Sequence, residues 1–159
     1  MSYLNDLLDR VVALEKEAMT SMNVKADAVP RFYYVGEGFP YFTNRIADTP
    51  ISDDGSEEVD LHSPLVIMRL VVGHITEGYK GQPEAKLYTW LPAIKTYFNE
   101  RMWLTSETYP DRMGYLQSAR ITNGGGLRVF ENAGIAAMQV GAEIQLACTF
   151  YELIEQDTY

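Results

Sequence analysis

The sequence predicts an α+β fold: a mainly antiparallel, twisted sheet with an N-terminal amphipathic helix and a second, central helix packed on it. Two observations support this prediction. In two separate segments the apolar residues recur at three- and four-residue steps, which is typical of amphipathic helices. Other segments are rich in Val, Ile and aromatic residues, and the last of them alternates apolar and polar residues, which is typical of β-strands.

The size and composition of the chain fit a single domain over residues 1–159. The chain has 159 residues, of which 47% are hydrophobic and 22% are charged, and such a chain can bury a sizeable core. Cys148 is the only cysteine, so an internal disulfide and a CxxC motif are excluded. We interpret Cys148 as a small buried hydrophobe rather than as a reactive nucleophile.

Acidic residues dominate the charge of the chain. The 22 Asp and Glu residues against 13 Lys and Arg give a formal net charge of −9, which excludes a diffuse basic surface that gathers nucleic acid by counterion release. An acidic channel, in contrast, would let DNA slide past. The N-terminus lacks the features of a signal peptide, and no apolar stretch approaches the roughly 20 residues that span a bilayer. We therefore expect a cytosolic protein without a membrane contact.

The first helix is predicted near the N-terminus, with Ser2 as its N-cap and its end before Asn23. Charged residues, including Glu15, lie largely on the side opposite the apolar stripe. One apolar stripe usually docks on the protein's own sheet, although a partner-binding helix is the alternative. The stripe consists of Leu4, Leu7, Leu8, Val11, Leu14 and Ala18.

An aromatic segment follows, with short strands predicted at 31–35 and 41–46. Glycine and proline residues between them indicate kinks. Phe39, Tyr41 and Phe42 either pack inside the domain or are presented to a partner, since aromatic residues are enriched in both places.

Residues 48–60 are polar and acidic, and we expect a mobile loop there. The loop carries Asp53, Asp54, Glu57, Glu58 and Asp60. Their spacing lacks the alternating ligands of an EF-hand, so we predict no metal site but a solvated charge run, or one ordered against a neighbouring molecule.

Residues 64–78 are rich in Val and Ile and predict a long strand, buried on much of both faces, at the centre of the sheet. His74 lies near the end of this strand, and His62 is placed in the preceding loop. Two histidines without further ligands make a weak metal site, so structural or surface roles are expected for both.

The second helix is predicted over residues 84–103. Leu87, Leu91, Ile94, Phe98 and Met102 form its inner stripe, which Trp90 and Tyr97 widen. Because Pro92 removes an internal hydrogen bond, we expect a kink or a break into two segments there.

Three strands are predicted to complete the chain, at 115–122, 127–138 and 140–152. The last one alternates, and its polar face, with Glu143 and Gln145, meets water or another subunit. Residues 123–126, with the sequence NGGG, lie between two strands, so we predict a hairpin connection rather than a phosphate-binding loop, which would require a helix behind it.

We find no catalytic constellation in the sequence. The GxSxG, HExxH, kinase and Walker motifs are missing, and nothing in the spacing of Glu77, Glu131 and Glu143 brings these carboxylates together. We therefore expect a protein that is not an enzyme and that has no cofactor.

The predicted order of elements is a helix, aromatic strands, a long loop, a long strand, an aromatic helix and a terminal β-meander. This order resembles the tail terminator, or tail completion, proteins of long-tailed bacteriophages. The segments that carry the resemblance are KLYTWLPAIKTYFNERMWL and LRVFENAGIAAMQVGAEIQLACTFYELIEQ. Their similarity is one of hydrophobic pattern, and the segment 36–60 is longer than in some relatives.

The resemblance implies a structural virion protein at the head-proximal end of the tail. Such a protein forms a homo-oligomeric ring, typically of six copies, that stops tail-tube polymerisation and binds the tail tube protein on one face and the head or neck connector protein on the other. DNA passes through the lumen without specific binding. The predicted contact elements are 48–60 and 122–127, and the candidate interface residues are Phe39, Tyr41, Phe42, Asp53, Asp54, Glu57, Glu58, Asn123, Gly124, Gly125, Glu143 and Gln145.

Two alternatives remain open at this point. The first is a head–tail connector or another neck protein, which is built on similar small α+β rings. The second is a small-ligand-binding domain or an enzyme of unknown chemistry, with a pocket between the helix at 84–103 and the sheet.

Overall fold

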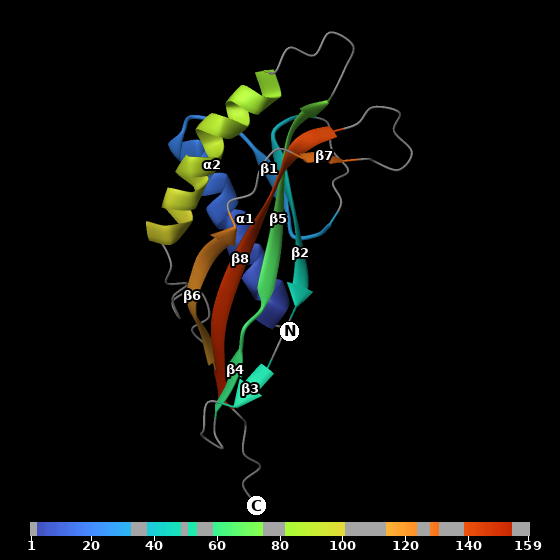
Figure 1. Ribbon diagram of the computed structural model, residues 1–159. Helices are drawn as coiled ribbons and strands as arrows, with labels where there is room; N and C mark the ends of the chain where they lie inside the picture. The colour runs from blue at the N-terminus through green and yellow to red at the C-terminus, as the bar shows by residue number, and fades with distance from the viewer. Residues whose placement is uncertain are drawn as a thin grey trace, which may run out of the picture.

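The computed structural model (Figure 1) has two helices and an eight-stranded, mostly antiparallel sheet, which confirms the predicted α+β class. The helices are α1 (Tyr3–Ser21) and α2 (Gln82–Glu100). The strands are β1 (Asp27–Val29), β2 (Tyr41–Asp48), β3 (Ile51–Asp53), β4 (Val59–His62), β5 (Leu65–His74), β6 (Gly114–Asn123), β7 (Arg128–Phe130) and β8 (Gln139–Leu153). The structure describes residues 3–32, 38–48, 51–53, 59–74, 82–100, 114–123, 128–130 and 139–153.

Strand β8 is the axis of the sheet. It has 15 residues and is therefore about 50 Å long. Strands β5 and β4 pair with successive parts of one of its edges, and β7 and β6 pair with successive parts of the other. The carbonyl oxygen of Pro64 accepts a hydrogen bond from the amide of Cys148 at 3.0 Å, which continues the pairing between β4 and β5.

The remaining strands lie at the outer edges of β5 and β4. β2 pairs with β5, and β3 pairs with β4, both antiparallel. β1 lies on the outside of β2 and is parallel to it. The predicted central position of the strand at 64–78 is confirmed for its described part, because β5 lies between β2 and β8.

Both helices cover the same face of the sheet, where the main core lies (Figure 1). Alternate residues of β5 face them, namely Val66, Met68, Leu70 and Val72, and all four are buried. The predicted helix stripes are confirmed for Leu7, Val11, Leu14 and Ala18 in α1 and for Leu87, Ile94 and Phe98 in α2, each at most 1% exposed.

Helix α1 ends as predicted, before Asn23. The amide of Val24 donates to Met19 O at 2.9 Å, and the amide of Asn23 donates to Thr20 O at 2.9 Å. Asn23 has a φ of 59°, the left-handed conformation that Asn adopts more readily than most residues. This double hydrogen bond satisfies the last carbonyl groups of the helix.

The predicted hairpin at NGGG is wrong. β6 and β7 are both antiparallel to β8 and pair with the same edge of it, so they run in the same direction and cannot form a hairpin with each other. Asn123 pairs with Gln145, and Arg128 pairs with Gly141. The two strands therefore lie end to end along β8.

Three further predictions need correction. The segment 48–60 is not a loop throughout, because 51–53 and 59–60 belong to the paired strands β3 and β4, and His62 ends β4 rather than lying in a loop. Helix α2 continues through Pro92 without a break into two segments. Glu15 lies in the core and not on the polar side of α1, since none of it is exposed.

Other predicted positions fall outside the described residues or outside the strands. Ser2, Met102 and residues 33–35, 54–58 and 124–127 lie outside the described residues, and Arg31 and Phe32 form a bend rather than a strand. Strand β1 was not predicted from the sequence, because three residues are too few to show a period.

Candidate functional site

The helices cover only one face of the sheet, and we call the opposite one the helix-free face. It is built from the alternate residues of β2, β5 and β8 that point away from the core, together with two residues of β7. Its members are Tyr41, Thr43, Arg45, Ile67, Arg69, Val71, Arg128, Phe130, Gln139, Glu143 and Gln145.

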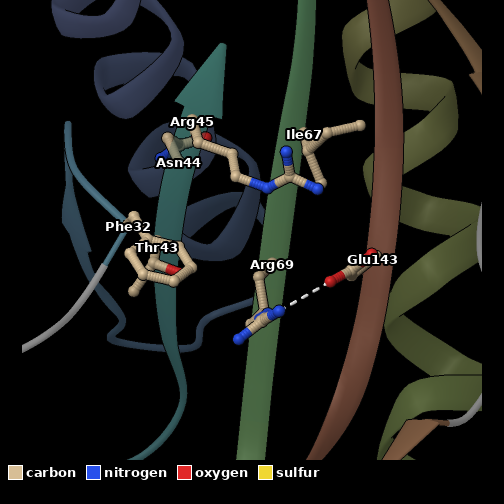
Figure 2. A pocket seen from close by; sticks show the side chains of 7 residues that line it. All are labelled: Phe32, Thr43, Asn44, Arg45, Ile67, Arg69 and Glu143. Carbon is tan, nitrogen blue, oxygen red and sulfur yellow. Dashed lines mark hydrogen bonds and ion pairs between the residues drawn. The ribbon is translucent and has the colours of Figure 1, made fainter. Parts of the chain in front are cut away.

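Arg69 is at the centre of this face, because the register places Thr43 on one side of it and Glu143 on the other. Its Nη2 donates to Glu143 Oε1 at 2.7 Å (Figure 2). The two side chains are 28% and 21% exposed, so water partly screens the pair, and we assign it about 1 kcal/mol.

Two aromatic rings flank the Arg69 guanidinium. Its Cζ lies 4.2 Å from the centre of the Phe130 ring and 6.0 Å from that of Phe32. A cation over an aromatic face contributes about 0.5–1 kcal/mol at a partly exposed site. The side chain of Arg69 thus joins β5 to β8, to β7 and to the segment before β2, and is held in one place.

A second group of contacts lies at the end of the face where β8 begins. Tyr41 Oη donates to Gln139 Oε1 at 2.7 Å. The Phe39 ring stacks on Tyr41 at 5.7 Å and meets His74 edge-on at 4.7 Å. Burial raises the pKa of Tyr41 above its ordinary value of 10, so its hydroxyl remains a donor at neutral pH.

The helix-free face has little room to enclose a small molecule around Arg69. The hollow there has a volume of about 10 Å³, which holds about one water molecule. Its walls are Phe32, Thr43, Asn44, Arg45, Ile67, Arg69 and Glu143 (Figure 2).

A wider hollow, of about 580 Å³ and open to solvent, lies on the other side of the molecule, between the end of α1 and the outer side of α2. The pocket that the ligand-binding alternative requires, between α2 and the sheet, is filled over the described part of α2. Leu87, Ile94 and Phe98 pack there into the core.

The predicted interface residues separate into different places. Glu143 and Gln145 lie on the helix-free face, as does Tyr41, of which only 6% is exposed. Phe39 is 37% exposed, whereas Phe42 is fully buried on the helix side and cannot be an interface residue. Asp53 and Asn123 end β3 and β6, and Asp54, Glu57, Glu58, Gly124 and Gly125 lie outside the described residues.

Arg69, Phe130 and Phe32 were missed by reasoning from the sequence. A signal existed for Arg69, since it is the only charged residue in the apolar run PLVIMRLVV. The period of two places it opposite Met68 and Leu70. Its aromatic partners gave no such signal, because they come from segments far away in the sequence.

The interpretation of Cys148 as a buried hydrophobe is confirmed. Its side chain is 2% exposed, and burial raises the pKa of the thiol to about 12. It is therefore a protonated, unreactive thiol at neutral pH.

The fold and the helix-free face define an α+β domain whose sheet offers one surface built from several strands. A scan of known protein families finds no model that matches the chain, and no curated protein matches it either.

Within the described part of the chain, no helix is long and apolar enough to cross a membrane. The same residues contain no group of three or more potential metal ligands.

Proposed function

We propose that this protein is a structural component of a phage virion, a tail terminator that forms a ring at the head-proximal end of the tail tube and joins it to the neck. Part of the order of elements on which the resemblance rests supports the proposal, namely α1, β2, β5, α2 and the terminal strand β8. The predicted long loop instead carries β3 and β4, and the last strands do not form a meander. The acidic net charge of −9 is compatible with a lumen that DNA crosses without sticking.

The observation that carries the proposal is the helix-free face. Arg and aromatic side chains, which are enriched at the centres of protein interfaces, converge on it from three parts of the chain. Phe32 keeps 59% of its surface exposed beside Arg69, and aromatic side chains are enriched at protein interfaces. We assign this face to the contact between neighbouring subunits.

The first test is the molar mass of the purified protein, alone and mixed with the tail-tube protein of the same phage, by light scattering after size exclusion. A closed ring, or a short tube capped by it, is expected. A ring that ignores the tube protein but binds the neck would instead assign the chain to the connector proteins. A strict monomer in both experiments would refute the proposal.

The second test reverses the charge of Arg45, which is exposed on the helix-free face. In Arg45→Glu we expect the ring to dissociate at a protein concentration about tenfold higher or more, because the face then carries an added negative charge, which the net charge of −9 on the neighbouring subunit repels. Lys95→Glu is the control, since Lys95 is exposed on α2 and the charge change is the same. Equal effects of both variants, or an effect of Lys95→Glu alone, would show that the interface is elsewhere.

A further inference from the structure

A carboxyl group lies in the middle of the core between α1 and the sheet. Glu15 belongs to α1 and is 0% exposed. Its Oε1 accepts a hydrogen bond of 2.7 Å from Nδ2 of Asn44 in β2. Its other oxygen, Oε2, is buried and has no hydrogen-bond partner among the described residues. An ionised carboxylate left in this state would be very unfavourable in an apolar interior.

The orientation of the Asn44 amide follows from its neighbours. Nδ2 also donates to the carbonyl oxygen of Val29 in β1 at 3.1 Å. Since a carbonyl oxygen can only accept, the nitrogen must be on that side, and a flipped amide would face two acceptors. Both amide hydrogens are then used, and Oδ1 is a buried acceptor for which the described residues supply no donor.

The two unsatisfied atoms therefore belong to the two side chains that are already bonded to each other, and both are acceptors. A single proton on the carboxyl group would correct both faults, because it removes the charge and supplies the missing donor. We propose that Glu15 is a neutral carboxylic acid in the folded protein, and that Glu15 and Asn44 form an acid–amide pair that locks α1 onto β2. This inference does not rest on the proposed ring.

The surroundings of Glu15 support the neutral form. Burial raises the pKa of Glu15 well above its ordinary value of 4.5, and this effect exceeds the opposite effects of the Asn44 hydrogen bond and of the Lys16 charge. On β1 and β2 the charged residues Asp27 and Arg45 are exposed, and Arg45 points to the helix-free face.

The helices bring no other charge that counters the burial of Glu15, as far as the structure describes them. Arg10 lies about 140° away around the axis of α1. Helix α2 packs on the core through Leu87, Ile94 and Phe98, which are all apolar.

The sign of the pH dependence follows from the raised pKa. Below the pKa of the unfolded chain, both states hold the proton and the full stability is present. As the pH rises from there toward the pKa of the folded protein, the unfolded state releases a proton that the folded state keeps, so stability falls. In this window the unfolding equilibrium constant rises by up to about tenfold per pH unit.

The test compares Glu15→Gln with the wild type by urea unfolding between pH 5 and 8.5. The glutamine side chain would keep the hydrogen bond to Asn44 and supply its own donor without a titrating group. We expect this variant to have the same free energy of unfolding as the wild type near pH 5 and a higher one at pH 8. The fall in stability with rising pH described above should be absent from it. Glu17→Gln is the control, because it removes one negative charge from an exposed position of the same helix. Its stability should fall with rising pH as that of the wild type does.

A second measurement uses only the wild-type protein and therefore does not depend on whether a variant folds. The side-chain carboxyl carbon of Glu15, followed by NMR in the labelled wild-type protein, should show a protonated acid at pH 7. A carboxylate signal at pH 7, or a Glu15→Gln variant less stable than the wild type at pH 8, would overturn the inference.

Discussion

Polar side chains of two strands each connect several elements of this molecule. Arg69 points away from the core and connects β5 to β8 through Glu143 and to β7 through Phe130. Asn44 points toward the core and connects β2 to α1 through Glu15 and to β1 through Val29. Each of these residues holds three parts of the chain, so each is a position where a substitution would affect several elements at once.

Gly141 is a residue that cannot be replaced without moving the backbone. It pairs with Val71 at the point where the β5–β8 register shifts, and a Cβ atom there would collide with the carbonyl group of Leu70. We expect Gly141→Ala to lower the free energy of unfolding by about 2–3 kcal/mol, because overpacking forces the two central strands apart. Urea unfolding measures this change. A variant as stable as the wild type would show that β5 and β8 are not this close.

The burial of individual residues could be predicted only in part. The positions of Leu7, Val11, Leu14 and Ala18 were clear, since all are apolar. The same stripe includes position 15, four residues after Val11 and three before Ala18, but the residue there is Glu. The charged side chain of Glu15 predicted a position on the surface, whereas its spacing in the helix predicted a position in the core. The prediction from the spacing was correct, because Asn44 of the sheet supplies a hydrogen-bond partner. One helix alone does not reveal that partner.

At the scale of elements, the type of each long segment was predictable and its partner was not. Helices α1 and α2 and strands β2, β5, β6 and β8 lie close to where the local patterns put them. The NGGG segment was misinterpreted because glycines between two strands are a local sign of a hairpin. Whether the flanking strands pair with each other or with a third strand depends on β8, which comes later in the chain.

The continuity of α2 through Pro92 gives a prediction about an element. Pro92 lacks an amide hydrogen and strains the preceding turn, yet it is exposed and contributes little burial. We expect Pro92→Ala to raise the free energy of unfolding by about 2 kcal/mol, which is the helix penalty of Pro reduced by its restriction of the unfolded chain. Thr96→Ala, one turn later and also exposed, should change it by less than about 0.5 kcal/mol. A lower free energy of unfolding in Pro92→Ala than in the wild type would contradict this prediction and would mean that the proline ring makes a stabilising packing contact.

At the scale of the whole molecule, the sheet separates two faces of different composition. The helix side holds the main core, which extends from α1 and α2 to the buried residues of β5 and β8. The helix-free face holds only a small apolar cluster of Tyr41, Val71 and Phe130 among the described residues, with charged residues beside it. The first surface therefore stabilises the fold, and the proposed ring would use the second at its exposed residues, among them Arg45.

The same architecture predicts how stability is distributed over the molecule. β8 is paired on both edges along much of its length, and β5 is paired with β2 and β8. β1 is three residues long and, among the described strands, pairs only with β2. We expect native-state hydrogen exchange to be slowest in the centres of β5 and β8, where it should require global unfolding, and faster by a factor of about 100 or more in β1.

NMR-detected exchange of the monomer in increasing urea would measure this gradient. Amides of β8 should follow the global unfolding transition, and those of β1 should exchange by local opening with little urea dependence. If β8 exchanged as fast as β1, the strand could not be the axis of the sheet. A different result would be that β1 is protected as well as β8 in the ring but not in the monomer. A neighbouring subunit would then cover the outer edge of β1, and the interface would extend beyond the helix-free face.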